Sequence, residues 1–564
     1  MERTYIFIVF LLLSARLPAQ WVPGGIHLSE QGAPLLGVVR AIEADGHGGA
    51  YVVWHSSAER VYVQRVSSDG LELWGHGGKK LTDAGSFASV LADGDSGVFV
   101  AWEGYDPFDA IKVQKLDLDG HILWDNGGVW ASIDGWGGLG PLLALDGAGG
   151  VFVSWCGILP ASIHGLAPWL QRFDALGHRL WGDSALVLSH RDLPEHGTGM
   201  QDYAVSLVAG GTPGGALVFW NEEWGPNYNI GQTYGQCIDG SGRALWKMDG
   251  IALSDDNSTW YRACISSVGD GAGGAFVGWY AGGFSSVQHV DSMGARRLGK
   301  NALNLGYCST SRHSRHLIAD AHGGAYFISN RSVVPMDLRL QQIDWRDSVR
   351  FRENPAGIRL AMDGNPWGEI MALDGQGGEF IVTTRLDDVI HSRRSLLYNH
   401  VDSAGKSLFG DNNWLKVVNT VEYDGNIDIT STAPGEAMVT WIDTRDTPTV
   451  SSGGIFIAKI DVQGIVPVHP LAQYQPHTLS LGGPYPNPAN TSSLIECSLS
   501  VPSAVRVTLV DIGGHEVCLL DEGRHPAGEF YVPVDTSPLA AGSYFIVAKA
   551  GEETAHARLL VARK

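Results

Sequence analysis

The sequence is built on a unit of roughly 50 residues that recurs eight times, a pattern typical of solenoids, propellers and repeat arrays. Each copy contains an Asp/Gly turn and an apolar strand, as in residues 45–54, and then a second strand that carries a Gln. A further turn and a Trp-containing tail complete the unit. The first turn places a Gly near each of these positions: Gly48, Gly97, Gly149, Gly214, Gly273, Gly323, Gly377 and Gly435.

The tails are out of phase with the apolar strands. Seven tails follow a strand, and they begin at Trp74, Trp124, Trp181, Trp246, Leu298, Phe351 and Phe409. The eighth tail, residues 21–28, precedes the first unit. Such a segment can supply the missing last strand of the final unit and so close a ring, whereas an open solenoid has no use for it. The pattern predicts an all-β chain with an eight-bladed β-propeller over residues 20–470, closed by an N-terminal strand.

The two kinds of connection predict two different faces of this ring. Asp/Gly turns join the first strand of a blade to the second, and the third to the fourth, so these tight turns share one face. The remaining connections share the opposite face and vary in length. Variable loops on a rigid scaffold are where binding sites usually lie. We therefore expect any ligand site on the variable-loop face.

The longest of these loops are expected at residues 156–168, 190–203 and 221–232. They combine carboxylates, imidazoles and aromatic rings, which can hold a sugar by stacking and hydrogen bonds, although a solvated loop can have the same composition. The candidate ligand-binding residues are Trp169, His190, Asp192, Glu195, Tyr203, Glu222, Trp224 and Tyr228.

Other recurring residues predict structural roles. One Gln per unit, in six of the eight units, is expected to satisfy the same backbone groups in each blade. The Asp of the first turn, as in Asp45 and Asp146, is expected to cap that turn, because a calcium loop needs several oxygen ligands. No CxxC pair supports a zinc site. The sequence thus predicts no metal and no cofactor.

Charge and apolar segments restrict the partners and the compartment. The formal net charge of −21 disfavours nucleic acid, since phosphate binding needs clustered Lys and Arg. Residues 1–19 join Arg3 to a short apolar run and end at Ala19, which indicates a cleaved signal peptide. No other apolar run approaches the length of a transmembrane segment.

The last part of the chain, after a linker at residues 471–478, has a different pattern. Its short strands and Gly/Pro turns predict a small antiparallel sandwich with an Ig-like fold. Cys497 and Cys518 lie in this part, either as a disulfide or as two thiols. The characteristic residues occur in this order: Tyr485, Pro486, Asn487, Pro488, Asn490, Asp511, Gly514, Val517, Gly542, Tyr544 and Lys564.

These motifs make residues 479–564 closely similar to the type A C-terminal sorting domain of the type IX (Por) secretion system of Bacteroidota and related bacteria. Ala489 stands where that family usually has Phe. The resemblance implies export through the type IX machinery to the medium or the outer-membrane surface. The propeller repeats resemble those of secreted bacterial proteins without an established activity.

Three functions are compatible with this organisation. Uniform blades and absent catalytic motifs favour a non-catalytic module that binds an extracellular glycan or protein, or that has a structural role at the surface. The alternative is a carbohydrate-active hydrolase or lyase with its site on the variable-loop face, whose catalytic residues the sequence does not identify.

Overall fold

The chain forms two compact units, residues 1–468 and 469–564. The computed structural model describes residues 21–563 except for 22–23, 30–40, 57, 106–108, 134–136, 159–165, 191–204, 225–229, 257–261, 282, 308–316, 332–336, 352–356, 361, 363–365, 389–392, 410–413, 422–426, 444–453, 466–478, 482–483, 485, 500–502, 514, 527 and 551–552. The expected signal peptide and linker lie outside the described residues.

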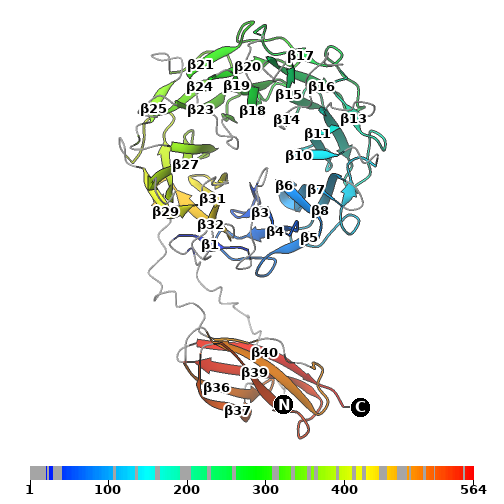
Figure 1. Ribbon diagram of the computed structural model, residues 1–564, viewed down its shortest axis with the longest axis vertical. Coiled ribbons are helices and arrows are strands. Elements are labelled where there is room, and N and C mark those ends of the chain that lie inside the picture. Colours follow the sequence, from blue (N-terminus) through cyan, green and yellow to red (C-terminus); the bar gives the residue numbers. More distant parts are fainter. Residues whose placement is uncertain are drawn as a thin grey trace, which may run out of the picture. The chain divides into compact units, whose positions relative to one another are not determined.

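Each repeat of the first unit folds into an antiparallel sheet, and eight such sheets form a ring (Figure 1). Blades one to four consist of β2 (Ile42–Ala44), β3 (Ala50–His55), β4 (Val61–Val66) and β5 (Lys79–Thr82); β6 (Gly85–Ala92), β7 (Val98–Gly104), β8 (Ala110–Leu116) and β9 (Val129–Trp130); β10 (Gly138–Leu145), β11 (Val151–Ile158), β12 (Leu166–Phe173) and β13 (Leu186–Val187); and β14 (Val205–Ala209), β15 (Ala216–Trp224), β16 (Ile230–Ile238) and β17 (Ile251–Ala252).

Blades five to seven repeat this order, and blade eight differs. They consist of β18 (Arg262–Gly269), β19 (Ala275–Ala281), β20 (Phe284–Val290) and β21 (Leu303–Tyr307); β22 (Leu317–Ala319), β23 (Ala325–Arg331), β24 (Asp337–Ile343) and β25 (Ile358–Leu360); β26 (Pro366–Leu373), β27 (Glu379–Asp388), β28 (Arg393–Val401) and β29 (Leu415–Val421); and β30 (Asp428–Ala433), β31 (Glu436–Asp443), β32 (Gly454–Asp461) and the short β33 (Gly464–Ile465). A 3₁₀ turn, η1 (Gly94–Ser96), precedes β7.

The N-terminal strand completes blade eight, as the phase of the repeats predicts. Strand β1 (Ile26–His27) pairs antiparallel with β32, with Ile26 opposite Ile457. The Leu28 amide also donates to the Ile455 carbonyl at 2.8 Å. Leu28 is fully buried in a cluster that joins this segment to blades one and eight. The last blade is therefore made from both ends of the propeller sequence.

The second strand of each blade lies between neighbouring sheets, which explains its apolar sequence. All six residues of β3 are buried. The side chains of Tyr51 and Val53 pack in one cluster with Val100 and Trp102 of the next blade. The labelled first strands β6, β10, β14 and β18 lie on the inner side of their blades, toward the centre of the ring (Figure 1). Ends of first and second strands on the variable-loop face thus surround the central axis.

The recurring polar residues close turns, as predicted. Asp45 Oδ1 accepts from the amides of His47 and Gly49, both at 2.8 Å. The amide group of Gln171 donates to the Gly182 carbonyl at 2.8 Å, and its oxygen accepts from the Trp181 amide at 3.2 Å. The same pair of bonds holds the tail in blades one, two, four, five and six.

The second unit contains two antiparallel sheets that share one core. One has the order β34-β35-β38 and the other β37-β36-β39-β40. Their bounds are β34 (Leu479–Leu481), β35 (Ser492–Leu499), β36 (Ser503–Val510), β37 (Glu516–His525), β38 (Gly528–Asp535), β39 (Gly542–Ala550) and β40 (Glu553–Val561). No disulfide joins Cys497 to Cys518. The arrangement is the predicted sandwich.

Candidate functional site

Trp169 lies in a strand and is buried, so its expected position in an exposed loop is wrong. It lies in β12, with 2% of its surface exposed. Its ring stacks on Trp155 of β11 at 6.0 Å between centroids. The expected loop at 156–168 is shorter than predicted, because β11 continues to Ile158 and β12 begins at Leu166. Trp169 is therefore part of the packing between blades.

Glu222 is also buried, with 4% of its surface exposed. One carboxylate oxygen accepts from the Ser189 hydroxyl and from the Trp220 indole, each at 2.8 Å. These bonds tie the end of the second strand to Ser189. Glu222 is thus engaged within blade four and is not open to a ligand in this structure.

Among the predicted residues whose side chains are described, His190 is the most exposed, with 67% of its side chain exposed. Its amide donates to Asp249 Oδ1 at 2.9 Å, so His190 itself is held by the tail of blade four. Trp224 ends β15, and its side chain is not described. Asp192, Glu195, Tyr203 and Tyr228 lie outside the described residues.

A polar group that the sequence analysis missed lies on the variable-loop face of blade two. Ser86 at the start of β6 is paired with Glu103 near the end of β7. The Tyr105 hydroxyl is hydrogen-bonded to the Ser86 hydroxyl and donates to Glu103 Oε2 at 3.3 Å. Glu103 Oε1 accepts from the Gly140 amide of blade three at 2.9 Å. The group therefore joins two blades through one carboxyl.

Burial changes the acid–base properties of these side chains. Glu103 is 4% exposed, and burial raises its pKa to about 7, although the bond from Gly140 opposes the rise. Burial also raises the pKa of Tyr105. Glu103 is therefore a carboxyl that exchanges its proton near neutral pH.

Blade one adds an imidazole to this region. His55 ends β3 and is 1% exposed, and its ring lies 5.7 Å from the Phe87 ring of blade two. Burial lowers the pKa of His55 to about 4, so the ring is neutral at pH 7. We call His55, Ser86, Phe87, Glu103 and Tyr105 the blade-two cluster. Adjacent blades bring it together, so a single repeat gives no signal for it.

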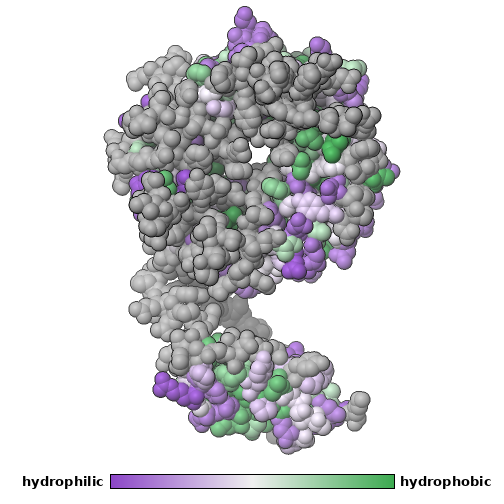
Figure 2. Space-filling model, in the orientation of Figure 1, coloured by the Kyte–Doolittle hydropathy of each residue, from purple (hydrophilic) through white to green (hydrophobic). Residues whose placement is uncertain are grey.

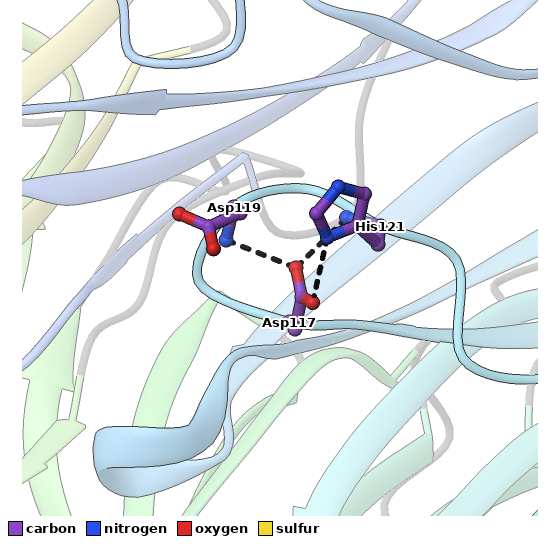
Figure 3. A group of neighbouring side chains, drawn as sticks. All are labelled: Asp117, Asp119 and His121. Carbon is purple, nitrogen blue, oxygen red and sulfur yellow. Dashed lines mark hydrogen bonds and ion pairs between the residues drawn. The ribbon is translucent and has the colours of Figure 1, made fainter.

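One group among the described residues has donor atoms close enough to hold a metal ion, namely Asp117, Asp119 and His121 (Figure 3). Asp117 Oδ1 accepts from the amides of Asp119 and His121 at 2.9 and 2.8 Å. The equivalent turn from Asp174 to His178 makes the same bonds with Leu176 in the middle position. The arrangement thus closes a turn with or without the second carboxylate.

In the second unit, the sorting-domain motif binds the last strand. Asn487 donates to the Arg558 carbonyl and accepts from the Leu560 amide, both at 2.8 Å. The Ala489 amide donates to the Leu560 carbonyl at 2.8 Å, and its methyl group is fully buried. Pro486 accepts from the Ser493 hydroxyl at 3.0 Å. Pro488 lies between these residues. The hydrogen bonds of Asn487 and Ala489 thus hold the beginning of the unit against its last strand, β40.

Basic and turn residues of the motif make further links. Arg563 donates to the carbonyls of Asn490, at 2.5 Å, and of Ser537, at 2.9 Å. Asp511 closes its turn by accepting from the His515 amide, and the Tyr544 hydroxyl donates to the Ala540 carbonyl at 3.1 Å. Gly542 begins β39. Tyr485, Gly514 and Lys564 lie outside the described residues.

Hydrophobic side chains remain exposed on this unit. Hydrophobic and hydrophilic residues are interspersed over its visible face (Figure 2). Val517 of the motif is 41% exposed, and Leu519 in the same strand is 45% exposed. Val517 is therefore not part of the core of the sandwich.

Comparison with protein families identifies the second unit. Residues 484–562 match the secretion system C-terminal sorting domain of the Por type. The protein therefore carries a type IX sorting domain and is a secreted or surface-attached protein of a Gram-negative bacterium. No curated protein matches the chain in sequence. Among the described residues no helix is long and apolar enough to cross a membrane.

Solved propeller structures are distant from this chain. A lectin from Burkholderia pseudomallei is 14% identical with a TM-score of 0.41, covering 70% of this chain and 100% of its own. An ulvan lyase bound to -[GlcA(1-4)Rha3S]- is 12% identical with a TM-score of 0.37, and the match covers 78% of this chain and 96% of the lyase. A puromycin hydrolase is 14% identical with a TM-score of 0.39, and the match covers 76% of this chain and 61% of the hydrolase. None of these activities is transferred to this chain.

Proposed function

We propose that this protein is a secreted or surface-displayed β-propeller that binds an extracellular glycan or protein on its variable-loop face without converting it. The observation that supports this most directly is the difference between the two faces. The tight-turn face repeats the same Asp contacts from blade to blade, whereas the variable-loop face gathers different polar and aromatic side chains. Differentiation of one face on a repeated scaffold is typical of a binding surface.

A carbohydrate-active hydrolase or lyase is the second candidate, and Glu103 favours it. A carboxyl with a pKa near 7 that is bonded to a tyrosine hydroxyl has the properties of a general acid or base. Against this, Glu103 is almost wholly buried and already accepts a bond from Gly140. Binding is therefore the better supported function.

Affinity electrophoresis separates these possibilities. The chain without residues 1–19 is run through gels that contain plant, algal or bacterial polysaccharides, and the same mixtures are assayed for new reducing ends. Retardation without new ends is expected. New ends would establish an enzyme, and the absence of both effects would point to a protein partner or a structural role.

Variants locate the site on the proposed face. Trp224→Ala and Tyr228→Ala, in the 221–232 segment, are expected to reduce retardation by about tenfold in apparent affinity, the effect of losing one aromatic contact of about 1.4 kcal/mol. Trp345→Ala is the matched control, since Trp345 is 58% exposed in a turn between the third and fourth strands of blade six, on the tight-turn face. Equal retardation of all three variants and the wild type would place the site elsewhere.

A further inference from the structure

A backbone bulge in blade two places an aromatic residue where blades three and seven have glycine. In the first strand of blades two, three, five and seven, two residues lie opposite one residue of the second strand, and in blade five the first of the two is Cys264. The first of these two residues is Gly140 in blade three and Gly368 in blade seven, with φ of +62° and +67°. In blade two it is Phe87, with φ of +43°.

This backbone conformation is unfavourable for phenylalanine. The left-handed region crowds any Cβ atom, and bulky side chains are rare in it. Glycine adopts it at no steric cost, as in blades three and seven. Strain of this kind persists where the surrounding structure imposes it, and it is concentrated at functional sites. Phe87 therefore has a conformational cost that a glycine at the same position would remove.

The Phe87 ring is not used to fill the core. It is 43% exposed, whereas the neighbouring Ala88 is fully buried. On one side lies the His55 ring of blade one. The His55 Nδ1 atom is buried and has no hydrogen-bond partner in the described part of the chain. A polar atom that is buried without a partner is uncommon in native proteins and calls for an explanation.

On the other side, Phe87 follows Ser86 directly in the chain. Ser86 is bonded to Tyr105, and Tyr105 to Glu103. Hydroxyl and carboxyl groups of this kind can both donate and accept hydrogen bonds when the carboxyl is protonated. An exposed aromatic face beside such groups matches a pyranose ring, which has an apolar C–H face and hydroxyl groups around its edge.

We propose that Phe87 is the stacking platform of a subsite for a neutral sugar residue of an extracellular glycan, with hydrogen-bonding groups supplied by His55 and Tyr105. The subsite deepens the proposed function and depends on the glycan form of it. The charges near blade two favour a neutral sugar over an acidic one. Near the start of this blade, Arg60 and Lys80 are both paired with Asp83, at 3.2 and 2.7 Å.

The proposed role of Phe87 is tested by a substitution that should raise stability and weaken binding. Phe87→Gly removes the strain and the ring together, so its Tm is expected to rise by a few degrees while retardation in gels of neutral polysaccharide falls at least tenfold. Phe87→Tyr keeps an aromatic ring on the strained backbone and is expected to retain binding. Trp345→Ala, with its ring on the tight-turn face, serves as the control and should bind as the wild type does.

The possible failures are distinguishable. If the wild type is retarded and Phe87→Gly is retarded equally, the subsite is wrong and the proposed function stands. A Tm of Phe87→Gly clearly below that of the wild type, as measured by calorimetry, would show that the ring is structural and would also overturn the subsite. If no neutral polysaccharide retards the wild type, the glycan form of the proposed function fails and the subsite fails with it.

Discussion

At the level of single residues, Glu379 places a carboxyl inside the core, at a position where several other blades have a small apolar residue. It begins β27 opposite Val401, a position that four other blades fill with Ala50, Ala216, Ala275 or Ala325. Its side chain is fully buried, and neither carboxyl oxygen has a hydrogen-bond partner among the described residues. Burial raises the pKa of Glu379 well above 4.5. The carboxyl therefore keeps its proton to a higher pH in the folded protein than in the unfolded chain.

This shift sets the sign of a pH effect on stability. The pKa of Glu379 is higher in the folded protein than in the unfolded chain. Its contribution to the free energy of unfolding is therefore fully present below about pH 4.5 and is lost as the pH rises through the pKa of the folded state. We predict that Glu379→Gln, which cannot ionise, removes this pH dependence, and that Glu379→Ala, which also removes the unsatisfied polar group, raises the free energy of unfolding at pH 7 by about 1–3 kcal/mol. Thermal unfolding measured between pH 4.5 and 8 checks this.

The matched control is Glu436→Ala at the start of β31. Glu436 is only partly buried and pairs with Lys459 at 2.7 Å, so its loss should change Tm little or lower it slightly. If the Glu379 variants show the same decline of Tm with pH as the wild type, Glu379 is not the buried acid described above.

The sequence predicts the repeated residues well and the site poorly, for a physical reason. The roles of Gln171 and Asp45 follow from one unit, because the bonds that hold the tail and close the turn stay within a blade. The blade-two cluster depends on contacts between blades, as between Glu103 and Gly140, and on a left-handed φ at Phe87 that no local motif announces. Trp169 was misplaced because strands β11 and β12 extend into the expected loop.

At the level of elements, the N-terminal segment determines whether the ring is closed. The phase of the tails predicts this closure, since it depends only on the order of strands along the chain. Gly25 shows how closely the segment packs, because a Cβ atom there would lie 2.4 Å from the Trp441 ring. The segment is thus fitted to blade eight by shape as well as by hydrogen bonds.

We predict that Leu28→Ala weakens this closure. Leu28 is fully buried, and replacing a buried leucine by alanine costs about 2–5 kcal/mol. The amides of residues 454–458, which lie opposite β1, should exchange their hydrogens faster in the variant. Leu176→Ala, at a side chain that is 74% exposed, should leave exchange unchanged. Unchanged protection of residues 454–458 in Leu28→Ala would contradict the importance of this strand.

At the level of the whole molecule, the two units have separate cores, and their functions should be separable. The motif residues Asn487 and Ala489 bind the last strand of their own unit. We predict that deletion of residues 469–564 leaves the Tm of the propeller within about 2 °C and abolishes export, so the shortened protein accumulates in the periplasm. Calorimetry and cell fractionation check the two parts.

A point variant separates folding from export in the same experiment. Asn487→Ala leaves the propeller sequence intact and removes two hydrogen bonds to β40. It should lower the Tm of the sorting unit alone and reduce the exported fraction. Loss of the propeller transition on deletion of residues 469–564 would show that the units depend on one another for stability.

Pairing of β1 with β32 also restricts the way in which the propeller reaches its native state. The first and last segments of the propeller must be present together before the final blade has its outer strand. Until then, the chain has an open sheet edge in blade eight, which can recruit strands from other molecules. Shortening of the N-terminus by a peptidase after export would recreate that edge in an otherwise intact protein. The trimmed form should therefore aggregate, and the lifetime of the protein outside the cell would depend on the segment around β1.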